Sequence, residues 1–393
     1  MGVMKYFLPA LAAASIVSAI ECDGDTITIE NEGDAAALVE CQKVEGDVVI
    51  AEQAANIISL MGVQEITGSL SCDGGENITE LSAPDLKTIG NEFNLKGLSK
   101  LNSLAFASLE EVGSITFDSL AHLRQLTFTK GVSKADSVKI TNTYLTTLEG
   151  IALDDVSEMY IANNIYLTKV DVDEIKSIKG NVDFASNHKD LQISFPNLKE
   201  AQNMTFRNAS SVSLPSLESV SGGLGFYSNY MEEFQGPNLT EAKSFLVFID
   251  NPNLTNVSLP ELTSVGGTFQ IANNTKLDKV TGVPKLEIIE GALDFSGNIT
   301  EVELPALKDV QGAFNMQSSG KLDCGKMSEF DGDVVKGDFD CYSDVEDPGT
   351  EGTTPSGGSG SGDDSEDSAA LDRVSLTYVV GFAGLVGALM QVL

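Results

Sequence analysis

The stretch LPELTSVGGTFQIANN, residues 259–274, decides the fold, because the chain repeats its pattern many times. In this pattern a proline is followed two residues later by leucine, then by a glycine, by alternating apolar residues and by asparagine. Similar stretches begin at Leu214, Gly236, Val283 and Leu304. Successive prolines of the repeat are 19 to 24 residues apart, at positions 196, 215, 237, 260, 284 and 305. The middle of the chain is therefore built from one unit used repeatedly.

A period of this length indicates a solenoid, in which each coil covers the apolar face of the next. Apolar and polar residues alternate within the unit, as in FQI at 269–271 and LDF at 293–295, and this alternation predicts strands. We therefore predict an all-β chain, folded as a parallel β-solenoid with about 20–24 residues per coil. Roughly a dozen coils are expected between about Asp47 and Ser319.

An asparagine recurs near the end of most units, every 21 to 24 residues. Asparagine tolerates left-handed backbone and bonds to nearby backbone groups. One asparagine per coil therefore predicts an inward-pointing ladder at the turn. Its predicted members are Asn142, Asn164, Asn187, Asn208, Asn229, Asn251, Asn274 and Asn298.

Both ends of the chain carry processing signals. Residues 1–19 combine a lysine, an apolar run and a small-residue cleavage site, the pattern of a secretory signal peptide. Small residues at 368–370, a spacer at 371–378 and an apolar tail at 379–393 together form the pattern of a GPI-attachment signal, whose propeptide is residues 369–393. We expect removal of this propeptide and attachment at Ser368, with Gly362 and Gly360 as weaker candidates.

The remaining chain divides into a solenoid and a stalk. The repeats and cysteines predict a solenoid domain over residues 20–342. Residues 343–368 are rich in glycine, serine, threonine and acids, which predicts a disordered stalk. The formal net charge of −34 argues against a nucleic-acid partner, which requires a basic surface. No motif indicates a cofactor or a small-molecule substrate.

Five cysteines in a secreted chain favour disulfides. We expect Cys22–Cys41 and Cys324–Cys341 to close the two ends of the solenoid, where caps are needed. Cys72 is then left over, and a Cys41–Cys72 pair stays open as an alternative. Zinc is a poor interpretation, because cysteine pairs at two-residue spacing are absent and the chain has two histidines.

Asn-x-Ser/Thr occurs eight times, and in a secreted chain these sequons are N-glycan acceptors. The ladder separates them into two groups. Asn208 and Asn298 are predicted to point inward and so to be poorer acceptors. The better acceptors are predicted to be Asn77, Asn203, Asn238, Asn253, Asn256 and Asn273.

Catalysis has little support in the sequence. Parallel β-helices can carry polysaccharide-cleaving enzymes, which need two positioned carboxylates. The acidic pairs at 154–155 and 232–233 instead suit solvated loops. His122 lies between apolar residues and is interpreted as a strand residue, and His188, beside a ladder asparagine, as a turn residue.

A binding role is the alternative, because solenoids offer long surfaces and sugar-binding faces use aromatic rings. The chain has no tryptophan, and most phenylalanines fall at inward strand positions. Phe226, Tyr227 and Tyr230 are the candidates for a small outward aromatic patch, but ordinary packing plus one aromatic residue in a turn is the favoured interpretation.

Several stretches resemble the fungal "extracellular mutant" family of GPI-anchored cell-wall proteins. They are NMTFRNASSVSLPSLESV at 203–220, LGFYSN at 224–229, PNLT at 237–240, IANN at 271–274 and GALDFSG at 291–297. The cysteine-bounded head at 22–41, GDVVI at 46–50 and LDC…GDFDC at 322–341 are also similar. The likeness spans the predicted solenoid.

The resemblance implies a right-handed β-helix like the receptor L domain, with leucine-rich-like repeats. It also implies an N-glycosylated surface protein, held by a GPI lipid in the outer leaflet of the plasma membrane or transferred to wall glucan. Its implied role is cell-wall organisation and integrity, without known catalysis. A glycan- or protein-binding ectodomain is the alternative, and a polysaccharide-modifying enzyme is the third interpretation.

Overall fold

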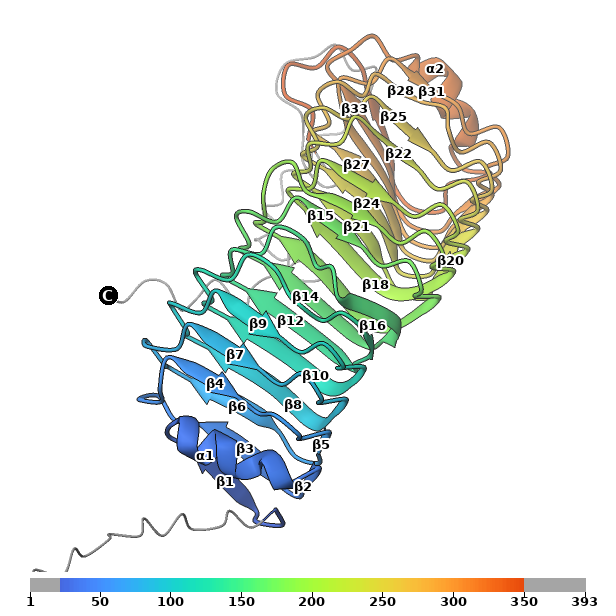
Figure 1. Ribbon diagram of the computed structural model, residues 1–393. Coiled ribbons are helices and arrows are strands. Elements are labelled where there is room, and N and C mark those ends of the chain that lie inside the picture. The colour runs from blue at the N-terminus through green and yellow to red at the C-terminus, as the bar shows by residue number, and fades with distance from the viewer. Residues whose placement is uncertain (1–21, 350–393) are drawn as a thin grey trace, which may run out of the picture. The chain divides into compact units, whose positions relative to one another are not determined.

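The computed structural model describes residues 22–349, which form a parallel β-solenoid of about 14 turns (Figure 1). This confirms the predicted all-β repeat fold. Each coil contributes strands to three faces of the solenoid. The chain passes first through a strand of what we call the long face, then through a turn to a strand of the third face. It returns through the short-strand face to the long face of the next coil. Within residues 22–349, all strand pairings are parallel, as stacked coils require.

The long face stacks one strand per coil. Its strands are β1 (Thr26–Ile29), β3 (Asp47–Ile50), β6 (Leu70–Asp73), β8 (Thr88–Lys96), β10 (Glu111–Asp118), β12 (Ser137–Thr141), β14 (Glu158–Ala162), β16 (Ser177–Ala185), β18 (Glu200–Arg207), β21 (Leu224–Tyr227), β24 (Phe245–Ile249), β27 (Thr268–Ala272), β30 (Leu293–Gly297), β33 (Phe314–Ser318) and β34 (Phe339–Tyr342).

The other two faces are made of shorter strands. The short-strand face contains β2 (Lys43–Val44), β5 (Glu65–Ile66), β11 (Val132–Lys134), β13 (Ile151–Val156), β20 (Ser219–Val220), β23 (Glu241–Ala242), β26 (Ser264–Val265), β29 (Ile288–Ile289) and β32 (Asp309–Val310). The third face contains β4 (Ile57–Ser59), β7 (Glu80–Ser82), β9 (Ser103–Ala105), β15 (Lys169–Asp171), β17 (Gln192–Ser194), β19 (Ser211–Ser213), β22 (Glu233–Gln235), β25 (Asn256–Ser258), β28 (Lys279–Val280) and β31 (Glu301–Val302).

The core lies between the three faces and follows the alternation of the repeat. Inward residues stack on the same residue of the next coil, so phenylalanines form columns. The rings of Phe206, Phe226 and Phe248 lie parallel, with centroids 5.5 and 4.8 Å apart. All three are fully buried, and each contributes about 1.5–3 kcal/mol through burial.

The glycine of the repeat marks the corner where the short-strand face meets the long face. The Gly312 N–H donates to Gly291 O at 2.9 Å, and the Gly291 N–H donates to Gly267 O at 3.1 Å. A Cβ atom on Gly291 would lie 2.7 Å from the Gly267 carbonyl carbon. Glycine is therefore required because neighbouring coils touch backbone to backbone.

In most turns that follow a long-face strand, two adjacent residues have different roles. The first residue has left-handed backbone, and the second points inward. Asparagine fills both positions at 163–164 and at 273–274, where Asn163 and Asn273 have φ values of 59° and 56°. The inward residues Asn164 and Asn274 are 0% and 2% exposed.

The inward asparagines form the predicted ladder. Asn229 donates from its backbone N–H and its Nδ2 to Asn251 Oδ1, at 2.9 and 3.1 Å. Asn251 donates in the same two ways to Asn274 Oδ1, at 2.9 and 3.0 Å. Each amide thus satisfies a backbone donor that the turn would otherwise bury unpaired. The prediction is confirmed for Asn164, Asn187, Asn229, Asn251 and Asn274.

The prediction is wrong for Asn142, Asn208 and Asn298. Asn142 and Asn208 occupy the left-handed first position, with φ values of 55° and 61°, and Thr143 and Ala209 point inward instead. Asn298 is exposed on the outside of its turn. The physical reason is that asparagine suits the left-handed position as well as the inward one.

Short helices and the two predicted disulfides close the solenoid. The first cap contains α1 (Glu32–Ala37) and η1 (Leu38–Glu40), and the second contains α2 (Cys324–Met327) and η2 (Ser328–Phe330). Cys22–Cys41 and Cys324–Cys341 are bonded, and both pairs lie in the caps. Cys72 is a buried free thiol, so the alternative Cys41–Cys72 pair is not formed.

The chain stays packed beyond the last strand. Val345 is 3% exposed, and its N–H donates to Ser318 O at 3.0 Å. The Gly349 N–H donates to Gln317 Oε1 at 2.7 Å. Residues 343–349, which open the predicted stalk, therefore lie against the final coils. The rest of the stalk, the signal peptide and the GPI signal lie outside the described residues.

Candidate functional site

The eight sequons lie at several different positions of the coil. Asn77, Asn253 and Asn298 each come directly before the buried apolar residue that follows a long-face turn. Asn273 and Asn208 have left-handed backbone in that turn. Five acceptors are exposed, namely Asn77, Asn238, Asn256, Asn273 and Asn298, and three are half-buried, namely Asn203, Asn208 and Asn253. Burial thus gives no reason to separate Asn298 from the other acceptors, and the occupancy of all eight stays a prediction.

The candidate outward aromatic patch is not formed, because its three residues lie in different places, and the favoured interpretation of packing plus a turn aromatic is confirmed. Phe226 is fully buried in the core. Tyr227 lies half-buried on the long face, where the Arg207 guanidinium sits 5.1 Å from its ring centroid. Tyr230 is 42% exposed in a turn. The period-two alternation explains the separation, since adjacent strand residues point to opposite faces.

A different aromatic group appears on the outside of three successive turns. His122, Tyr144 and Tyr166 follow β10, β12 and β14, and we call them the aromatic column. The ring centroids of His122 and Tyr144 are 6.3 Å apart, and those of Tyr144 and Tyr166 are 4.7 Å apart. Arg124 lies 5.6 Å from the Tyr166 ring centroid. The sequence hint was an aromatic ring at 22-residue spacing, always directly before a leucine.

The interpretations of the two histidines fare differently against the structure. His122 lies in a turn, where its Nδ1 contacts Ser99 O, so its interpretation as a strand residue is wrong. His188 lies just after the long-face turn, as predicted, and its Nδ1 accepts the Asp190 N–H at 3.1 Å.

The long face carries an ion pair near its middle. Arg207 Nη1 donates to Asp183 Oδ1 at 3.0 Å. Burial raises the pKa of the Asp183 carboxyl, and the neighbouring guanidinium opposes that rise. Burial also raises the pKa of Tyr160 and Tyr227 on the same face. A single carboxylate paired to arginine does not supply the two carboxyl groups of glycoside hydrolysis.

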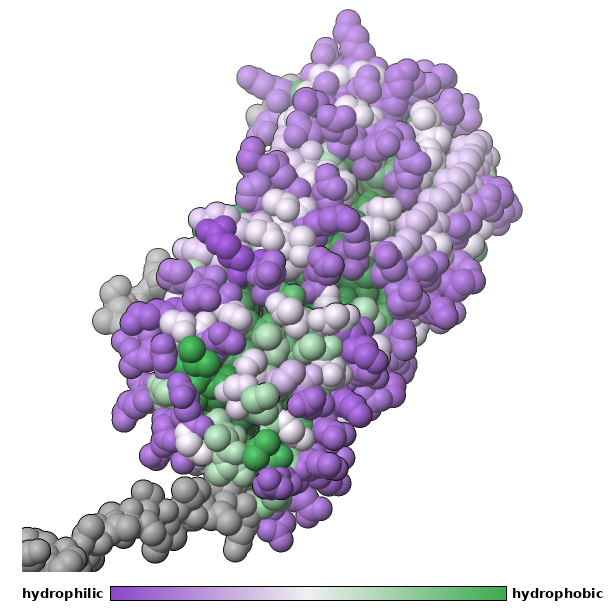
Figure 2. All heavy atoms as spheres, in the orientation of Figure 1, coloured by the Kyte–Doolittle hydropathy of each residue, from purple (hydrophilic) through white to green (hydrophobic). Residues whose placement is uncertain are grey.

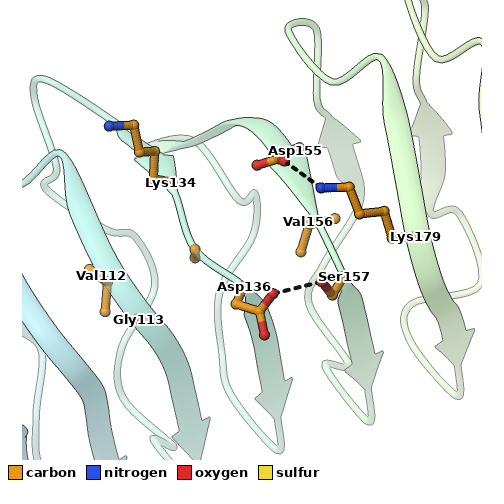
Figure 3. Close-up of a pocket in the computed structure, with 9 residues that line it drawn as sticks. Val112, Gly113, Lys134, Asp136, Asp155, Val156, Ser157 and Lys179 are labelled. Carbon is orange, nitrogen blue, oxygen red and sulfur yellow. Dashed lines mark hydrogen bonds and ion pairs between the residues drawn. The ribbon is translucent and has the colours of Figure 1, made fainter.

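A shallow depression of about 220 Å³ interrupts the glycine corner (Figure 3). It forms where Asp136 and Ser157 occupy the corner position in the two coils that follow Gly113. Figure 3 shows the Ser157 hydroxyl facing Asp136, a bond of 2.6 Å, and Lys179 facing Asp155 at 3.3 Å. The side chains of Lys179 and Asp155 are 69% and 58% exposed. The charges are thus paired and solvated, as is typical of an ordinary surface.

One face of the solenoid is mostly hydrophilic, and its apolar atoms gather toward the N-terminal end, over α1, β4 and β7 (Figure 2). The exposed large apolar residues of these first coils are Val39, Ile57 and Met61. Within residues 22–349, no group of three or more histidine, cysteine or acidic residues is placed to hold a metal ion. The same residues contain no helix long and apolar enough to cross a membrane.

Comparison with known proteins gives consistent results. The Ecm33 family model, described as a GPI-anchored cell wall organization protein, matches residues 1–39. "Protein ecm33" of Aspergillus fumigatus is 41% identical over 398 residues, covering 100% of this chain and 99% of the relative. "Cell surface GPI-anchored protein" of Arthroderma benhamiae is 42% identical over 385 residues, covering 98% of each chain.

More distant relatives match parts of the chain. "Cell wall protein ecm33" of Schizosaccharomyces pombe is 31% identical over 192 residues, which are 49% of this chain and 45% of the relative. No solved structure matches. The identity with the Aspergillus and Arthroderma proteins extends over nearly the whole length of each. The chain therefore belongs to the Ecm33 family.

Proposed function

We propose that this protein is a GPI-anchored, N-glycosylated cell-surface protein that acts in fungal cell-wall organisation without catalysing a reaction. One observation carries the proposal: the 41% identity to "Protein ecm33" covers 100% of this chain. The family model that matches residues 1–39 is described in the same terms. The protein would act at the outer face of the plasma membrane or in the wall itself.

The ends of the chain support this location. A secretory signal at 1–19 and a GPI signal at 369–393 would deliver the solenoid to the outer leaflet. Attachment would occur at Ser368, or at Gly362 or Gly360. Beyond Gly349, which contacts the final coils, the chain runs through glycine, serine and acidic residues to the anchor. The solenoid would then stand off the membrane on a short tether, or would be transferred from the lipid anchor to wall glucan.

The described surface supports a structural or interaction role over catalysis. The carboxylates at the depression are paired with lysine or serine and lie on an open surface. The ion pair on the long face holds a single carboxylate, Asp183, against Arg207. Catalytic acids usually come as a pair with pKa values pushed apart by their surroundings. A glycan- or protein-binding ectodomain is the second candidate function, and the exposed aromatic column favours it.

Complementation of a fungal strain that lacks the gene tests the proposal. The full chain should restore resistance to wall-perturbing dyes and to wall-digesting enzymes. A chain that stops after residue 368 should be secreted and should fail to restore resistance, because the tether to the surface is lost. The proposal is overturned if the deletion strain has normal walls, or if the untethered chain restores resistance fully.

A further inference from the structure

The aromatic column is not required by the fold. His122, Tyr144 and Tyr166 each come directly before the buried leucine of their turn, a position that most long-face turns contain. In most other coils the same position holds a polar residue, namely Asn77, Lys100, Asp190, Asn253, Lys276 or Asn298, and one further coil holds the isolated Tyr230. Those turns form with the same backbone bond, as in Leu254 N to Asn251 O at 3.1 Å. Three successive rings at this position therefore need a reason other than folding.

The rings lie one per coil and are at least partly accessible, since His122 is exposed and Tyr144 half-buried. Tyr166 is 39% exposed, and its neighbour Ile165 is 54% exposed. Because stacked coils rise by about 4.8 Å, one ring per coil gives a row that runs from coil to coil along the solenoid. Exposed apolar groups in a row mark an interaction surface more often than scattered single residues do.

Polar groups border the row on one side. Arg124 lies two residues after His122, and its guanidinium stays over the Tyr166 ring at 5.6 Å. This contact fixes the arginine near the rings while leaving N–H donors on its edge. The bond from His122 Nδ1 to Ser99 O leaves Nε2 as its second polar atom. The surface thus combines aromatic faces with hydrogen-bonding groups.

The aromatic column lies in a stretch of the chain without N-glycan acceptors. The chain has no Asn-x-Ser/Thr sequence between Asn77 and Asn203, and the aromatic column lies in that interval. In the same turn position, the next sequons on either side are Asn77 and Asn253. Asn253 donates to Tyr230 O at 3.4 Å, so a glycan there would cover Tyr230 and not the column. The row therefore lies between coils that carry sequons and itself carries none.

We propose that the aromatic column, with Arg124, binds a neutral linear polysaccharide. Ring faces carry negative charge and attract the C–H faces of sugar rings, and the N–H donors suit sugar hydroxyls. The net charge of −34 repels polyanions, so an uncharged chain is favoured. A row of rings on successive coils suits a linear polymer lying along the solenoid. This inference rests on the proposed placement at the cell wall, since that is where the polymer would be met.

Pull-down with insoluble wall polymers tests the site. Purified glycosylated ectodomain is mixed with particulate linear β-glucan, and separately with chitin. We expect binding to at least one polymer, and a loss of about tenfold or more in affinity for the double variant Tyr144→Ala/Tyr166→Ala. Tyr166→Phe should bind nearly as well as the native protein, because the ring is kept.

Tyr230→Ala is the matched control, because it removes an equally exposed tyrosine from the same turn position in a glycosylated coil. It should leave binding unchanged, and unfolding midpoints should show that every variant is folded. The proposal is overturned if the native ectodomain binds neither polymer, or if the double variant binds as well as Tyr230→Ala. Either result would leave the wall-organisation role standing, because complementation tests that role separately.

Discussion

Replacing Asn251 with alanine tests the asparagine ladder at its best-connected rung. The Asn251 side chain is fully buried, and its Oδ1 accepts two bonds from Asn229. Its Nδ2 donates to Phe226 O at 3.1 Å and to Asn274 Oδ1 at 3.0 Å. In the alanine variant, the Asn229 backbone N–H and one Nδ2 hydrogen lose their acceptor in the interior.

The magnitude follows from those two donors. A buried donor left without a partner costs about 1–3 kcal/mol, so the free energy of unfolding should fall by roughly 2–6 kcal/mol. Asn197→Ala is the matched control, because Asn197 is exposed and its Nδ2 makes one bond, to Asp173 O at 2.7 Å. That variant should lose about 1 kcal/mol or less. Neither substitution removes a sequon.

Guanidinium unfolding followed by circular dichroism gives the two midpoints, and the m-values show whether unfolding stays cooperative. Solenoids can unfold in sections, so hydrogen exchange of the peptide containing Asn229 should be measured as well. Exchange there should accelerate in Asn251→Ala and stay unchanged in Asn197→Ala. Equal stability losses in the two variants would refute the ladder as a stabilising element.

Three further predictions concern the cysteines and the glycans. Serine replacement of both Cys324 and Cys341 should lower the free energy of unfolding by about 3 kcal/mol and speed exchange in the final coils, measured against the native protein. Burial raises the pKa of Cys72 to about 12, with nearby acids adding to the rise, so the thiol stays protonated at pH 8. It should resist iodoacetamide until denaturant is added, and rapid labelling of the native protein would contradict its burial. Glycopeptide mapping should find a glycan on Asn298 about as often as on Asn253, because both occupy the same turn position on the outside of the solenoid. An Asn298 without a glycan would count against this placement.

The repeat, the strands and the caps could be predicted because they depend on patterns that recur in the sequence. The proline–leucine spacing and the alternation in FQI at 269–271 recur in coil after coil. The capping pairs Cys22–Cys41 and Cys324–Cys341 followed from the need to close both ends of a solenoid. Each of these features depends on residues within one repeat or at one end of the solenoid, so it can be predicted without knowing how neighbouring coils stack.

The inward register could not be predicted fully, because two adjacent turn positions both favour asparagine. At 273–274 asparagine occupies both turn positions, so the sequence does not show which of the two positions the recurring asparagine of another coil occupies. The choice between Asn208 and Ala209 for the inward position depends on how the coil stacks on its neighbours. Coil lengths that vary from 19 to 24 residues hide that stacking in the sequence.

The aromatic column was missed for a related reason. His122, Tyr144 and Tyr166 are 22 residues apart and look unremarkable one at a time. Their contact exists because β10, β12 and β14 pair in register, which brings the following turns together. The adjacent letters of Phe226, Tyr227 and Tyr230 suggested a patch that the alternation of the strand in fact divides.

Release of the protein from intact cells tests most directly whether it is tethered at the surface as a GPI-anchored wall protein. Washed cells are treated in parallel with a phosphatidylinositol-specific phospholipase, with β-glucanase or with buffer, and the released solenoid is detected by antibody. We predict release by the phospholipase from the membrane-held pool, by glucanase from any pool transferred to the wall, and by buffer not at all. Protein that is found free in the medium of untreated cells, with none held for either enzyme to release, would contradict the account.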